Sequence, residues 1–158
     1  MRPAPATARQ NSSASGALNV IELNPRFGGK YAKFSDVVFT PKPLQQPIPI
    51  WVGGESAPAL RRIMRYADCW YPVGTNPQFP MNTVTRFKSG LERFRGFADR
   101  GGRDPATLQV ALRVLVGPSH RPRRSIDGEG EMFTGGTADY VGDIKALQDL
   151  GVDAVDVR

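Results

Sequence analysis

From Ile48 onward, the apolar and polar residues follow a pattern that predicts alternating strands and helices. The first strand is the short apolar run IPIWV, which two glycines end. Ser56 is the expected N-cap of a helix of about three turns, with apolar residues on one side and arginines on the other. The expected buried positions of this helix are Leu60, Ile63, Met64 and Ala67.

The same alternation continues to Arg158. DCWYPV predicts a second strand, and the second helix starts after GTNPQFPMN and stops at GGRDP. LQVALRVLV is almost wholly apolar, as expected of a strand buried on both faces. Thr137 is the expected N-cap of a third helix, and VDAVDVR is the expected fourth strand. The expected apolar stripes are Val84, Phe87, Leu91, Phe94 and Ala98 on the second helix, and Tyr140, Val141, Ile144 and Leu147 on the third.

This order of elements predicts an α/β fold. Strands that alternate with helices through short connections form a parallel sheet with right-handed crossovers. Upstream, residues 1–16 are rich in Ala, Pro, Ser and Arg without periodicity, which predicts a disordered N-terminal arm. The segment that follows mixes β-formers with the turn signals NP and FGG, which predicts a hairpin or an extended excursion. We therefore assign residues 17–158 to one folded domain.

The net charge and the single cysteine indicate which kinds of ligand and which cellular environment suit the protein. The formal charge of +6 suits an anionic cofactor or nucleic acid, but the arginine clusters lack the interleaved aromatic residues of a base-stacking surface. Nucleic-acid binding is therefore the less favoured alternative. A single cysteine forms no internal disulfide and no metal cluster, so we expect no metal site and a reducing, cytoplasmic environment. Apolar runs are far shorter than the roughly 20 residues that span a membrane.

The segment VGGES is the strongest candidate for a binding site. In parallel α/β folds, residues between the carboxyl end of a strand and the next helix face the ligand. Gly53 and Gly54 allow close backbone approach, and the free N–H groups at the helix start suit a phosphate, to which Ser56 adds a hydroxyl. Glu55 would repel a phosphate, so we expect it to bind a ribityl or ring hydroxyl or to face water. The alternative is that the glycines only form a tight strand–helix turn.

A longer stretch supports the ligand interpretation by resemblance. GKYAKFSDVVFTPKPLQQPIPIWVGGESAPALRRIMRYADCWYP, with GRDP and FTGGTADYVGDIKALQDLGVDAV after it, resembles the bacterial luciferase-like monooxygenases, above all their deazaflavin-dependent oxidoreductase branch. Members of that family are (β/α)₈ TIM barrels, usually dimeric, that bind FMN or the deazaflavin coenzyme F420 at the carboxyl face. The resemblance runs from about Gly29 to Arg158 and matches roughly the last four parallel strands with their helices.

The resemblance implies a partial TIM barrel that carries the cofactor-phosphate half of a flavin- or deazaflavin-dependent oxidoreductase acting on a small organic substrate. It places Gly53, Gly54, Glu55 and Ser56 in the phosphate and ribityl region, whereas Ala59 stands where some relatives have a hydroxyl residue. The first four strands, with the family's usual catalytic side chains, have no counterpart, so we expect a truncated chain of uncertain activity. We expect it to pair with a second copy or a companion chain. A non-catalytic half-barrel is the alternative.

Other residues give weaker signals. His120 is the only histidine, and no partner in the sequence marks it as a general base, so a solvated loop histidine is favoured. Trp70 and Tyr71 follow a strand and suit either packing or stacking against a cofactor ring. Cys69 reads as a small buried apolar residue. Asp153 and Asp156 are not assigned as an acid–base pair, and we expect them to lie in water. The catalytic residues remain unassigned.

Overall fold

The computed structural model describes residues 24–38, 40–45, 47–115 and 121–158. The predicted arm and His120 therefore lie outside the described residues. Contacts divide the chain into two units, with the boundary after Ile48, so the predicted domain spans both. In the first unit, β1 (Phe27–Gly28) pairs antiparallel with β2 (Lys33–Phe34), which confirms the predicted hairpin.

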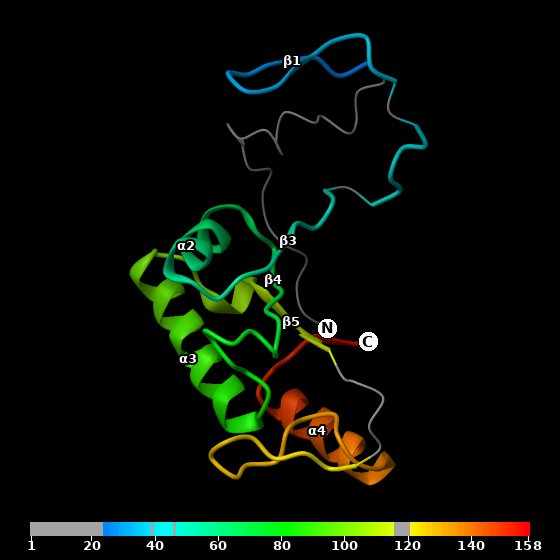
Figure 1. Cartoon of the computed structure of the whole chain (residues 1–158). Helices are drawn as coiled ribbons and strands as arrows, with labels where there is room; N and C mark the ends of the chain where they lie inside the picture. The colour runs from blue at the N-terminus through cyan, green and yellow to red at the C-terminus, as the bar shows by residue number, and fades with distance from the viewer. Residues whose placement is uncertain (1–23, 39, 46, 116–120) are drawn as a thin grey trace. The chain divides into compact units, whose positions relative to one another are not determined.

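The second unit contains a parallel four-stranded sheet with the order β3-β4-β5-β6 (Figure 1). Because each strand follows its neighbour in sequence and a helix connects each pair, the predicted alternation is confirmed. The strands are β3 (Trp51–Val52), β4 (Cys69–Trp70), β5 (Gln109–Val114) and β6 (Ala154–Val157). The helices are α2 (Ala57–Tyr66), α3 (Val84–Arg100) and α4 (Thr137–Asp149), with a 3₁₀ turn at Pro105–Thr107.

Helix α2 forms as its sequence predicts. The hydroxyl of Ser56 accepts a hydrogen bond from the N–H of Ala59 and caps the helix, and Leu60 and Ile63 are buried. At the other end, the guanidinium of Arg103 donates hydrogen bonds to the carbonyls of Ile63 and Met64, 3.2 and 3.1 Å away. The Ile63 carbonyl also accepts the N–H of the C-cap residue Ala67 at 3.0 Å, and Arg103 adds a donor for both carbonyls at the carboxyl end of α2.

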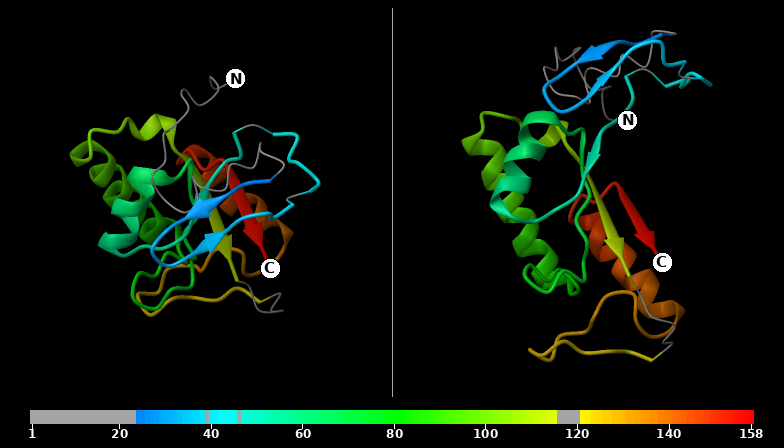
Figure 2. Two further views of the ribbon diagram at one scale, coloured as in Figure 1. Left: turned by 90° about the horizontal axis from the view of Figure 1, so that it is seen from above. Right: turned by 45° about the horizontal axis from the view of Figure 1, so that its top comes forward.

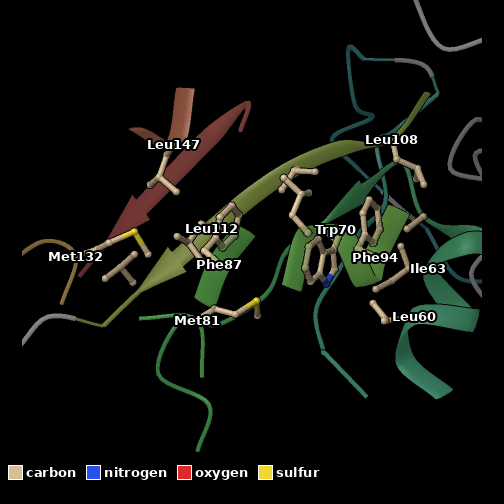
Figure 3. Close-up of a cluster of buried hydrophobic side chains, with 14 of the residues drawn as sticks. Leu60, Ile63, Trp70, Met81, Phe87, Phe94, Leu108, Leu112, Met132 and Leu147 are labelled. Atoms are coloured by element: carbon tan, nitrogen blue, oxygen red, sulfur yellow. The ribbon is translucent and has the colours of Figure 1, made fainter. Parts of the chain in front are cut away.

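Helix α3 contributes Phe87, Leu91 and Phe94 to the apolar core. Thr83 is its N-cap, and of the predicted inward positions Val84 is partly buried while Phe87, Leu91, Phe94 and Ala98 are buried. The rings of Trp70 and Phe94 stack at 4.5 Å between centroids, and Figure 3 shows them side by side in the core. Trp70 is therefore a packing residue of the sheet.

Helix α4 differs from its prediction in two respects. Its N-cap is Gly136, whose N–H donates to the carboxylate of Asp139, and Thr137 is the first helical residue. Of the predicted stripe, Leu147 is buried and Tyr140 packs against Phe133, but Val141 and Ile144 are 45% and 50% exposed. Among the described residues, β6 ends the sheet, so no further element covers that side of α4.

The three helices lie on one face of the sheet, as two further views show (Figure 2). Val110, Leu112 and Val114 point to this face and belong to the buried core. Because side chains alternate along a strand, Ala111 and Arg113 point to the opposite face. Within the described part of the second unit, no helix covers that opposite face.

Candidate functional site

The β3–α2 turn brings backbone and side chains close together. Gly54 has a φ of +105°, and a Cβ on it would lie 2.8 Å from the Cβ of Ala59. Its carbonyl accepts a hydrogen bond from the indole N–H of Trp70 at 3.1 Å. A Cβ on Gly53 would lie 3.1 Å from the carbonyl oxygen of Tyr71. Chain packing alone therefore calls for glycine at position 54, independently of any ligand.

Glu55 forms hydrogen bonds with other residues of the chain. Its side chain is buried, and one carboxylate oxygen accepts a hydrogen bond from the N–H of Val73 at 2.8 Å. The other oxygen accepts one from the side-chain amide of Asn76, and Arg93 donates to the Glu55 carbonyl. The expectation that Glu55 faces water is therefore wrong, because the β4–α3 loop holds its carboxylate.

The turn retains hydrogen-bond donors at the start of α2. Among the described residues, the backbone N–H groups of Gly54, Glu55 and Ser56 have no acceptor. The Ser56 hydroxyl accepts from Ala59 and keeps its own hydrogen for donation. The first turn of α2 contains no acidic residue, and the Glu55 carboxylate is held by the next loop. This donor set fits a phosphate group, and the expected repulsion from Glu55 is reduced.

The loops after β3, β4 and β5 meet at one edge of the sheet. Glu55 joins the first two, and the N–H of Met132 donates to the Asn82 carbonyl at 2.8 Å to join the second and third. Thr83 donates to Glu129, across the same two loops, at 2.8 Å. Between the loops after β4 and β5 lies a cavity of about 430 Å³, which is lined by Gly74, Asn76, Asn82, Leu115, Arg123 and Glu131 among others but by no residue of the β3–α2 turn. The predicted glycines therefore lie at the carboxyl edge, where parallel α/β folds bind ligands.

A polar row crosses the sheet face that lies opposite the helices. The hydroxyl of Tyr71, after β4, donates a hydrogen bond to Asp156 of β6, and Arg113 of β5 lies between them. Arg158 donates to the other oxygen of Asp156 at 3.1 Å. The hydrogen bonds from Tyr71 and Arg158 hold the pKa of Asp156 below its ordinary value, and the bond to Asp156 raises the pKa of Tyr71. Asp156 is therefore not simply solvated, contrary to expectation.

Arg113 was not predicted as a site residue from the sequence. Its Nε is buried, lies 4.0 Å from Asp156, and has no hydrogen-bond partner among the described residues. The signal was present in LQVALRVLV, because Arg113 is the one charged residue of a strand that is apolar apart from it and Gln109. Asp153 was also unassigned, and its carboxylate accepts the N–H of Val110 at 2.9 Å.

Cys69 agrees with its sequence-based interpretation as a small buried apolar residue. Cys69 is fully buried, and its burial, with nearby Asp153, raises the pKa of its thiol to about 12. It therefore behaves as a small core residue. No cluster of three metal-ligating side chains is present in the described ranges. No described helix is long and apolar enough to cross a membrane.

Comparisons with known proteins connect this geometry to a family. Two solved structures share the fold: an F420-dependent secondary alcohol dehydrogenase in complex with an F420–acetone adduct, and the coenzyme F420-dependent tetrahydromethanopterin reductase from Methanopyrus kandleri. The TM-scores are 0.58 and 0.54, at 13% and 14% sequence identity. The alignments cover 86% and 84% of this chain but 50% and 51% of those chains. The chain thus spans about half their length, which supports the predicted partial barrel.

Sequence comparison agrees with the structural match. A search of curated protein sequences gives no match. The family model described as "Luciferase-like monooxygenase" matches residues 20–124, which is more than half of the chain. This range includes β3, the β3–α2 turn and the β4–α3 loop that holds Glu55. The chain therefore belongs to the luciferase-like monooxygenase family.

Proposed function

We propose that this chain forms the cofactor-phosphate half of an oxidoreductase that uses the deazaflavin coenzyme F420 or FMN. The β3–α2 turn supports this proposal most directly, because free N–H groups and a serine hydroxyl lie together there, at the carboxyl edge of a parallel sheet. Membership of the luciferase-like family and the F420 named for both matched structures support this choice of ligand.

The residues of the turn have separate roles in this proposal. Gly53 and Gly54 let the backbone approach the phosphate, and Ser56 donates its hydroxyl hydrogen to it. Glu55 shapes the turn through Val73 and Asn76. When bound, the coenzyme supplies hydride or oxygen chemistry to a small organic substrate, and the chain binds and orients it. No catalytic side chain is assigned.

Coenzyme titration tests the proposal. Cofactor fluorescence is followed while purified protein is added to F420, to FMN, and to riboflavin, which lacks the phosphate. We expect saturable binding of F420 or FMN, and at least about tenfold weaker binding of riboflavin if FMN binds, as the loss of charge-assisted hydrogen bonds implies. Failure of both phosphorylated cofactors to bind would refute the proposal.

Two variants of Ser56 separate the phosphate site from helix capping. Asp and Asn are both good N-caps, so Ser56→Asp and Ser56→Asn are expected to leave α2 and the melting temperature nearly unchanged. Ser56→Asp puts a negative charge where the phosphate would lie and should abolish F420 or FMN binding. Ser56→Asn keeps a neutral donor and should weaken it only modestly. Equal effects of both variants would place the phosphate elsewhere.

A second candidate function is a half-barrel that binds the coenzyme without turnover. The observation that favours it is that the chain spans half the length of the matched structures. It predicts saturable cofactor binding but no oxidation or reduction of the coenzyme with any alcohol or aldehyde tested. Catalysis would then require further strands that complete the barrel.

A further inference from the structure

A cavity of about 350 Å³ lies between helix α2, the β4–α3 loop and helix α3, on the helix side of the sheet. The buried apolar side chains of Leu60, Trp70 and Met81 line it. Figure 3 shows Trp70 between the other two in the core. Sites for small organic molecules measure about 300–1,000 Å³ and have mostly apolar linings, so the size and the lining of this cavity suit such a ligand.

Contacts within the chain hold the walls of this cavity. Helix α3 has a glycine at position 90, where a Cβ would lie 2.5 Å from the Sδ of Met81, so Gly90 makes room for that side chain. In the β4–α3 loop, the N–H of Met81 donates to the Gly74 carbonyl, and the N–H of Gly74 donates to the Arg113 carbonyl, both at 2.9 Å. The loop is therefore anchored to β5, and the cavity is preformed.

Arg93 of α3 adds a positive charge to the lining. Its guanidinium lies over the rings of Phe79 and Phe97, 5.0 and 5.8 Å from their centroids, and its Nη1 donates to the Glu55 carbonyl. Arg93 forms no ion pair with any carboxylate of the described residues. A guanidinium has several N–H donors, so this one is held in position and still has donors for an external anion.

The other charged groups that line the cavity have partners within the chain. Arg86 pairs with Asp127, with 2.8 Å between nitrogen and oxygen. Both oxygens of the Glu55 carboxylate accept hydrogen bonds from the β4–α3 loop, which reduces the repulsion that Glu55 exerts on an anion. Arg93 is therefore the cation of this lining that a ligand can use.

We propose that this cavity binds a small aromatic carboxylate, with its ring against Leu60, Trp70 and Met81 and its carboxylate on the guanidinium of Arg93. An uncharged ring would leave the charge of Arg93 unpaired, and a sugar or a free phosphate would leave the apolar side chains uncovered. A planar carboxylate matches the two parallel N–H groups that a guanidinium offers. This site goes beyond the proposed function, because it is a second site and needs no coenzyme.

NMR titration with 2-naphthoate, without coenzyme, tests the site. The chain has two tryptophans, of which Trp70 lines the cavity and Trp51 does not. The indole N–H signal of Trp70 should shift saturably, while that of Trp51 stays nearly unchanged, and Trp51→Phe assigns the two signals. 2-Naphthamide has the same rings without the charge, and should bind at least about tenfold more weakly because the charge-assisted contact is lost.

Two variants with matched controls locate the carboxylate. Arg93→Gln should weaken the binding of 2-naphthoate about tenfold and leave that of 2-naphthamide nearly unchanged, because only the charged contact is lost. Arg100→Gln is the control: Arg100 also lies over Phe97, 4.7 Å from the ring centroid, but does not line the cavity. Circular dichroism and the melting temperature check that each variant folds.

A second pair of variants locates the ring. Ser89 and Lys88 are both exposed on α3, but only Ser89 lines the cavity. Ser89→Phe puts an aromatic side chain at the cavity and should block both probes, whereas Lys88→Phe should block neither.

Three results would overturn the proposal: no saturable shift of the Trp70 signal at millimolar 2-naphthoate, equal affinities for 2-naphthoate and 2-naphthamide, or equal losses in Arg93→Gln and Arg100→Gln. Similar shifts of both indole signals would also contradict it, because they would indicate binding to apolar surface in general. The comparison of the two probes uses the unmodified protein, so it decides the question even if Arg93→Gln does not fold. Because coenzyme is absent throughout, neither outcome bears on the phosphate site.

Discussion

Tyr71 donates a hydrogen bond to Asp156 across the intervening strand β5. The two residues are 85 positions apart in sequence, and their contact ties the loop after β4 to the edge strand β6. Arg113 lies between them, and Arg158 donates to the second oxygen of Asp156. The contact therefore reports whether the face opposite the helices is formed.

Tyr71→Phe is expected to raise the pKa of Asp156 toward its ordinary value, because the hydrogen bond from Tyr71 is the largest cause of its lowered pKa. Carboxyl-carbon NMR titration of both proteins measures the shift. Arg158 still donates in the variant, so the recovery should be partial. An unchanged pKa of Asp156 would show that the hydrogen bond does not persist in solution.

The same pair predicts how stability depends on pH. The pKa of Asp156 is lowered in the folded state. The carboxylate of Asp156 therefore stabilises the fold fully above the ordinary carboxyl pKa, and this stabilisation is lost as pH falls through the folded pKa. The pKa of Tyr71 is raised in the folded state. The protonated hydroxyl of Tyr71 therefore stabilises the fold fully below the ordinary phenol pKa, and this stabilisation is lost as pH rises through the folded pKa. Urea unfolding of wild type and Tyr71→Phe across pH should show their difference shrinking at both extremes.

Gly54→Ala is expected to destabilise the second unit by about 1–3 kcal/mol, because alanine would be strained at a φ of +105° and would press on Ala59. Urea unfolding measures the loss. Gly102→Ala is the control, since Gly102 also has positive φ but an added Cβ would meet nothing within 4 Å. Adding Ala59→Gly to Gly54→Ala should recover only the part of the lost stability that comes from the close approach of the two Cβ atoms, and not the part that comes from the positive φ. A loss no larger than that of the control would mean that the turn relaxes easily.

Glu55→Gln is expected to cost about 1–3 kcal/mol, because the new amide group would face a donor, either Asn76 or the N–H of Val73. Asn76→Asp alone should also destabilise, since it brings a second carboxylate to Glu55. Together, Glu55→Gln and Asn76→Asp reverse the direction of the side-chain hydrogen bond and should restore part of the loss in a double-mutant cycle. Additive effects in urea unfolding would contradict the contact.

Local sequence signals explain why much of the fold was predictable. Ser56 and the spacing of Leu60 and Ile63 defined α2, and the same reasoning placed the buried side of α3. Periodicity shows which side of a helix is apolar, but not whether another element covers it. Val141 and Ile144 were therefore predicted to be buried, although β6 ends the described sheet beside them.

The candidate site was less predictable because its contacts join distant residues. The pattern of VGGES located the turn at the carboxyl edge, but the partner that holds Glu55 is Asn76, 21 positions later in another loop. Nothing local to either residue marks that pairing. Arg113 and Asp156 are likewise neighbours only because β5 and β6 pair in register. Such contacts follow from topology, which the sequence pattern specifies only as an order of elements.

Cys69 gives a prediction about chemical reactivity. The side chain is fully buried in β4, and the pKa of its thiol is raised to about 12 by burial and by nearby Asp153. The thiolate is the nucleophile, so at pH 8 the folded protein should react with Ellman's reagent only when the sheet opens. We expect slow modification that accelerates with urea and reaches one thiol per chain in unfolded protein.

The Trp51→Cys variant provides the internal control for this measurement. Position 51 is about half exposed, so its thiol should react at a rate close to that of a small-molecule thiol while Cys69 in the same chain remains protected. Adding urea should change the rate at position 69 far more than at position 51. Rapid modification of native Cys69 without denaturant would mean that β4 is accessible in solution. That result would contradict the complete burial of Cys69 within the sheet.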